Sequence, residues 1–195
     1  MKRRSFVAMS LAAVTLPASA SARAQETPES TTDFGSLLPA ASAFGKGWKK
    51  FGNDVPSEVD NTTFVDGVLT AYGGPHGQRV RILILEHPDD RAAVNAAWET
   101  ATFTLAYLFV SSDYDVDYFD DSLNSAPIPT GTADAMRYQG TFRPYEFTFD
   151  SGAYAVEPNF VVIIGVEGDE VEYPGAEFTI ADNIASGIAA KLLSA

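Results

Sequence analysis

Three aspartates at alternate positions form the densest group of candidate metal ligands in the chain: Asp113, Asp115 and Asp117. Ca²⁺ prefers roughly six to eight oxygen ligands, which closely spaced carboxylates can supply. An EF-hand loop that began at Asp113 would need glycine at its sixth position and glutamate at its twelfth. The chain has Tyr118 and Asn124 there, so this loop is excluded, and a calcium-stabilised structural module stays open as an alternative.

The same alternation is typical of an exposed edge strand. Three residues between the aspartates would face the core while the carboxylates face water: Tyr114, Val116 and Tyr118. Charged side chains on an outer strand protect its open edge from aggregation. We therefore favour an edge strand within 111–121, and we assign no metal ligand and no cofactor.

Candidate catalytic residues lack the context that catalysis needs. The two histidines, His76 and His87, would lie at opposite ends of one strand, roughly 30 Å apart at about 3.3 Å per residue. We expect His76 to be solvated and His87 to precede a helix. Asp150-Ser151-Gly152 is interpreted as a turn, and no G-x-S-x-G sequence accompanies any serine. We assign no catalytic residue, and a small carboxylate-dependent hydrolase remains an alternative.

Arginines are scarce, so their positions are informative. Arg79 and Arg81 share one strand face, and Arg137 and Arg143 share another. Such faces could bind an anionic ligand in a bidentate manner. We favour the simpler interpretation, in which these arginines pair with nearby carboxylates on solvated sheet faces.

The charge of the chain limits its partners. The 195 residues carry 13 basic and 26 acidic side chains, a net charge of −13, and contain no cysteine. So acidic a surface repels nucleic acid and attracts cations. Cysteine nucleophiles, disulfides and cysteine-ligated metal clusters are excluded.

The first 24 residues have the order of an export signal. A basic start is followed by an apolar run and by two small-residue cleavage sites that end at Ala20 and Ala24. Arg3 and Arg4, followed by Phe6, also resemble a twin-arginine signal, so both this route and the Sec route stay open. The sequence predicts a signal peptide (1–24), a flexible linker (25–33) and a single domain (34–195) with an extracytoplasmic location and no transmembrane anchor.

Periodicity predicts an α+β fold, in which a mostly antiparallel sheet carries a central and a C-terminal helix on one face. A short helical turn is expected within 34–44. A hairpin of strands at 64–72 and 79–86 precedes a helix at 88–110 with Trp98 at its centre. A meander then spans 136–166, where 145–149 and 153–156 form either two strands or one long strand. The apolar stripe of the last helix comprises Phe178, Ala181, Ile184, Ala185, Ile188 and Leu192.

Leu37-Leu38-Pro39 followed by Gly47-Trp48, in this order of elements, resembles small exported bacterial α+β proteins of uncharacterised function. Some of these are sensor-like or lipoprotein-like domains. The resemblance implies a non-catalytic extracytoplasmic binding or sensor-type domain whose ligand is an unknown small molecule or protein. It transfers no catalytic residue, and the chain lacks the cysteine that a lipoprotein would acylate.

We predict that the exported protein begins at Ser21 or Gln25. Intact-mass measurement on the periplasmic or secreted fraction checks this, and recovery of an uncleaved Met1 species in the cytosol would contradict it. Replacing Arg3 and Arg4 together by lysine distinguishes the routes, because the twin-arginine pathway reads the arginines themselves.

Overall fold

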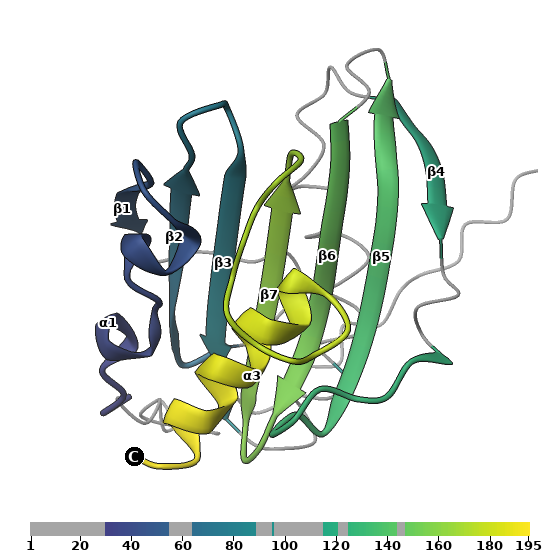
Figure 1. Ribbon diagram of the computed structural model, residues 1–195. Helices are drawn as coiled ribbons and strands as arrows, with labels where there is room; N and C mark the ends of the chain where they lie inside the picture. The colour runs from purple at the N-terminus through teal and green to yellow at the C-terminus, as the bar shows by residue number, and fades with distance from the viewer. Residues whose placement is uncertain (1–29, 55–63, 89–94, 96–114, 121–124, 144–146) are drawn as a thin grey trace, which may run out of the picture.

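The computed structural model describes residues 30–54, 64–88, 95, 115–120, 125–143 and 147–195. In this part of the chain seven strands form one antiparallel sheet in the order β1-β2-β3-β7-β6-β5-β4 (Figure 1). The strands are β1 (Lys49–Asp54), β2 (Asp66–Gly73), β3 (Arg79–Glu86), β4 (Asp115–Asp120), β5 (Asp134–Arg143), β6 (Phe147–Val156) and β7 (Phe160–Glu167). The helices are α1 (Phe34–Leu37), a 3₁₀ helix η1 (Ala41–Phe44) and α3 (Ile180–Leu192).

The expected α+β class is wrong, because the described fold is mainly β. Strands dominate it, two of its three helices are single turns, and only α3 covers the sheet over several turns. None of the described helices is long and apolar enough to cross a bilayer. The expected helix over 88–110, with Trp98, lies outside the described residues apart from its first residue and Asn95.

The structure also differs from the expectation at the turn around Gly152. Asp150-Ser151-Gly152 was expected to break the chain into a turn, yet these residues lie inside the continuous strand β6. A Cβ atom on Gly152 would lie 2.2 Å from the hydroxyl oxygen of Tyr154. Glycine is therefore needed here to make room for a neighbouring ring, and the alternative of one long strand is confirmed.

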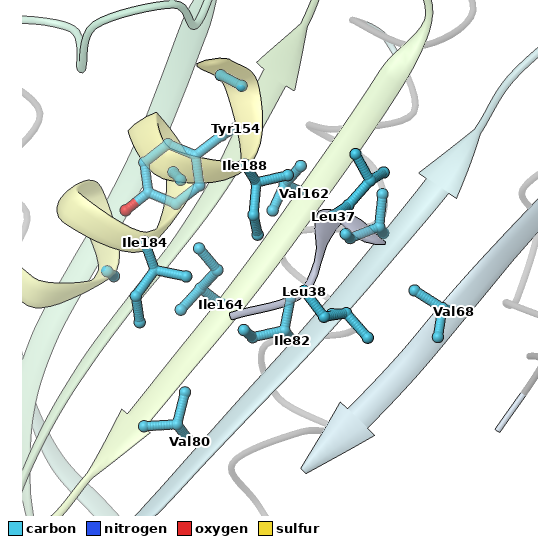
Figure 2. Packing of buried hydrophobic residues seen from close by; sticks show 14 of the residues in the cluster. Leu37, Leu38, Val68, Val80, Ile82, Tyr154, Val162, Ile164, Ile184 and Ile188 are labelled. Carbon is cyan, nitrogen blue, oxygen red and sulfur yellow. The ribbon is translucent and has the colours of Figure 1, made fainter. Parts of the chain in front are cut away.

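The core lies between α3 and one sheet face, as Figure 2 shows for Ile184 and Ile188. The helix begins after Thr179, whose side-chain oxygen accepts a hydrogen bond from the backbone N–H of Asp182. Its apolar stripe then packs on β6 and β7. Phe178 precedes this cap and is 66% exposed, so its expected place in the buried stripe is wrong. The sheet residues of this core include Val80, Ile82, Tyr154, Val162 and Ile164.

The N-terminal helical turns confirm the expectation for 34–44. Phe34, Leu37 and Phe44 are buried in the same core. Lys191 on α3 donates hydrogen bonds to three carbonyl oxygens at the end of α1, those of Ser36, Leu37 and Leu38. A cation at these carbonyls compensates both the unpaired acceptors and the negative end of the helix dipole.

Both faces of the sheet are buried near its centre. The face opposite α3 contributes four residues with at most 3% exposure: Leu83, Leu85, Val161 and Ile163. The run of apolar residues in β3 and β7 therefore lacks the alternation of a half-exposed strand. Such runs are typical of strands that are covered on both sides.

We predict that Ile188→Ala lowers the free energy of unfolding by about 2–5 kcal/mol, because the truncation leaves a cavity between α3 and the sheet. The matched control is Leu193→Ala, just beyond the same helix, where the side chain is 60% exposed and the loss should stay within about 0.5 kcal/mol. Urea denaturation measures both variants, and equal losses would contradict this packing.

Candidate functional site

A buried ion pair joins the sheet to α3. The Nε of Arg137 on β5 donates to Oδ1 of Asp182 on α3 over 2.7 Å, and each side chain is 1% exposed. The hydroxyl of Tyr154 on β6 donates to the same oxygen at 2.9 Å. The guanidinium also donates to the carbonyl oxygens of Ala126 and Pro127. Arg137 therefore lies inside the protein, and the expectation that it belongs to a solvated face is wrong.

Asp150 lies two positions from Gly152 on the same face of β6, and its half-buried side chain is the second acid of this region. Its Oδ2 accepts a hydrogen bond from the backbone N–H of Ala181 at 3.0 Å. Its Oδ1 is buried and receives no hydrogen bond from the described residues. Burial raises the pKa of Asp150 to about 6, although hydrogen bonds from Ala181 and Thr179 oppose the rise. The nearby carboxylate of Asp182 raises this pKa further.

A pocket of about 570 Å³ opens beside Asp150, within the range of roughly 300–1,000 Å³ usual for small-molecule sites. Its lining residues belong to the end of β5, the start of β6, the end of β7 and the segment just before α3. Its lining contains three carboxylates and no basic side chain. The lining residues are Gln139, Gly140, Thr141, Thr148, Phe149, Asp150, Val166, Gly168, Asp169, Glu170, Val171, Phe178, Thr179 and Ile180.

The loop after β7 supplies the other two acids of the pocket. Glu170 has a φ of +59°, a conformation that costs a residue with a side chain free energy and that is found mostly at turns and functional sites. The loop is fixed just before this residue by two hydrogen bonds to Thr148. Thr148 donates to Oδ1 of Asp169 at 2.8 Å, and the N–H of Gly168 donates to the carbonyl oxygen of Thr148 at 2.8 Å.

Most residues considered from the sequence lie away from this pocket. His76 is exposed in the β2–β3 turn, as expected, and His87 is buried at the other end of β3. Asp115 and Asp117 lie on β4, the outermost strand of the sheet, which confirms the expected edge strand. Asp113 lies outside the described residues, so the calcium alternative stays a prediction.

Arg81 pairs with Glu167 at 3.6 Å, as the simpler interpretation of that sheet face predicted. The side chain of Arg143 lies outside the described part of the molecule. Sequence reasoning missed Asp150, because Asp-Ser-Gly is a common turn sequence. The sequence did contain a signal that Asp182 is buried, since this acid lies next to the apolar stripe of α3, three residues before Ala185.

Comparison with known proteins shows a likeness of fold. No protein-family model matches the chain, and no curated protein matches it in sequence. Its fold is similar to that in the crystal structure of the extracellular domain of PknH from Mycobacterium tuberculosis, with a TM-score of 0.59 and 12% sequence identity. The match covers 83% of this chain and 95% of that domain. The chain thus has the sheet architecture of a known extracellular domain.

We predict that Asp150→Asn stabilises the protein at neutral pH but not at acidic pH. The pKa of this carboxyl rises from 3.8 to about 6 on folding, so the folded protein binds the proton more tightly than the unfolded chain. The resulting stability is present near pH 4 and is lost as the pH rises to about 6, a change of roughly 2–3 kcal/mol.

The difference in free energy of unfolding between Asp150→Asn and the wild type should therefore grow between about pH 4 and about pH 7. Urea denaturation at both pH values measures it. Glu157→Gln, an exposed acid in the β6–β7 turn, is the control and should show no such growth. A difference for Asp150→Asn that is independent of pH would contradict the buried position of this carboxyl.

Proposed function

We propose that this protein is a non-catalytic, extracytoplasmic binding domain of the sensor type, and that the pocket beside Asp150 holds its ligand. The observation that carries the proposal is the pocket itself, which combines a suitable volume with a buried carboxyl oxygen that lacks a hydrogen-bond donor. Buried polar atoms in proteins nearly always have a hydrogen-bond partner, so one without a partner beside a pocket indicates a place where a ligand could bind.

Two further observations support the extracytoplasmic location and the sensor-type class of the protein. The N-terminal residues have the order of an export signal. The fold is similar to that of the extracellular domain of PknH. Since a fold hosts many functions, this likeness supports the class of protein and leaves the ligand to the chemistry of the pocket.

Co-purification tests the proposal. We expect a small molecule to accompany the wild-type protein isolated from its exporting cells, and mass spectrometry of the denatured protein would detect it. Thr141→Trp should abolish this, because an indole at this exposed, pocket-lining position fills the cavity. Ser194→Trp, at the exposed C-terminus, is the matched control and should retain the ligand. Equal retention by both variants would contradict the pocket as the binding site.

One observation favours a second candidate, the small carboxylate-dependent hydrolase. A carboxyl with a pKa near 6 in a pocket is suited to act as a general acid at neutral pH. The same experiment separates the two functions, because a bound ligand should remain chemically unchanged on incubation with the wild-type protein. Conversion of the molecule by wild type but not by Asp150→Asn would instead support hydrolysis.

A further inference from the structure

We propose that the pocket selects an organic cation, whose ammonium or guanidinium group pairs with the carboxylate of Asp150. This inference rests on the proposed binding function and specifies the chemical class of the ligand. It follows from the charge of the lining, from the lack of a cationic partner for Asp150 and from the aromatic side chain of Phe178 at the pocket.

The charge of the lining is one-sided. Three of its residues, Asp150, Asp169 and Glu170, carry carboxylates, and no lining residue is basic. Arg137 on β5, which does not line the pocket, is engaged by Asp182 at 2.7 Å and by two backbone carbonyls. The carboxylates of the lining would therefore repel an anionic ligand and attract a cation.

Asp150 is the position where a ligand cation gains most. Its Oδ2 has a backbone donor, but its Oδ1 is buried without one among the described residues. A carboxylate removed from water is costly unless a hydrogen-bonded partner compensates its charge. Asp182, in the same region, has such a partner in Arg137, and Asp150 has no cationic side chain in the described structure. A ligand ammonium beside this carboxylate would supply the missing charge.

Phe178 gives the pocket an apolar surface suited to the same ligand. Its side chain is 66% exposed although it is large and aromatic, and it belongs to the lining. An aromatic face attracts an ammonium or guanidinium group through its quadrupole. A carboxylate together with an exposed aromatic side chain is a suitable environment for an organic cation.

The geometry does not favour a metal ion in place of an organic cation. Among the residues that the structure describes, no three acidic or histidine side chains are grouped closely enough to hold a metal. The carboxylates of the pocket come from two elements, since Asp150 lies on β6 and Asp169 and Glu170 lie on the loop after β7. A ligand of several atoms can contact both elements.

The test compares three probes of the same shape: phenethylamine, phenethyl alcohol and phenylacetate. Isothermal titration calorimetry on the exported protein should show millimolar-range binding of the amine, weaker binding of the alcohol and none of the carboxylate. Asp150→Asn should weaken the binding of the amine about tenfold or more, as expected for loss of a hydrogen bond between charged groups. Glu157→Gln removes one acid from an exposed turn and should leave the affinity unchanged.

The pH dependence gives an independent readout. With a pKa of about 6 for Asp150, the affinity of the wild type for the amine should fall about tenfold between pH 7 and pH 5. Asp150→Asn should lose most of this dependence. The charged and titratable groups around this carboxyl come from α3, β5, β6 and the loop after β7, namely Asp182, Arg137, the neutral phenol of Tyr154, Asp169 and Glu170. Glu170→Gln tests the contribution of the loop and should lower the affinity for the amine less than Asp150→Asn does.

The inference is overturned if the alcohol or the carboxylate binds as tightly as the amine, if no binding of the amine is detected, or if Asp150→Asn binds it like the wild type. These results differ from a failure of the proposed function. A neutral or anionic molecule that co-purifies with the wild type and is lost in Thr141→Trp would overturn the cation inference alone. Retention of the co-purified ligand by Thr141→Trp would overturn the binding site itself.

Discussion

The buried ion pair between Arg137 and Asp182 is the constraint on which the rest of this structure depends. Two charges with almost no exposure are tolerated only in good geometry with further hydrogen bonds, and here Tyr154 and two backbone carbonyls provide them. The pair fixes where the first turns of α3 lie on β5 and β6. The apolar stripe alone would permit sliding along a sheet face, because apolar contacts are not directional.

This docking of α3 also creates the pocket. The helix begins after Thr179 and covers the face of β6 and β7 toward the β6–β7 turn, so the opposite end of that face stays open around Thr141 and Thr148. Asp150 lies at the boundary, with one oxygen bound to the helix N-terminus and the other without a donor. A carboxyl in this position reduces stability at neutral pH, which is a common consequence of a binding site in an otherwise well-packed fold.

The likeness to the extracellular domain of PknH is one of fold, at 12% identity. A sheet of this kind can carry many sites, because the side chains on an exposed end of a face can change without altering the strands. The charges of this chain's pocket are therefore the better guide to its ligand.

The sequence by itself determined the local elements. The β-branched run of Arg79–Glu86 is a strand with the expected bounds, and the 3.6-residue period of the last helix placed Ile184 and Ile188 in the core. Such patterns are set by neighbours in the chain, and so they can be read locally. Tertiary structure decided the rest. It placed Asp150 in a strand, where Gly152 makes room for the ring of Tyr154 instead of forming a turn. It also buried Arg137 against Asp182, a partner 45 positions away. Whether a polar residue faces water or a buried partner depends on which face α3 covers, and no local pattern contains that information.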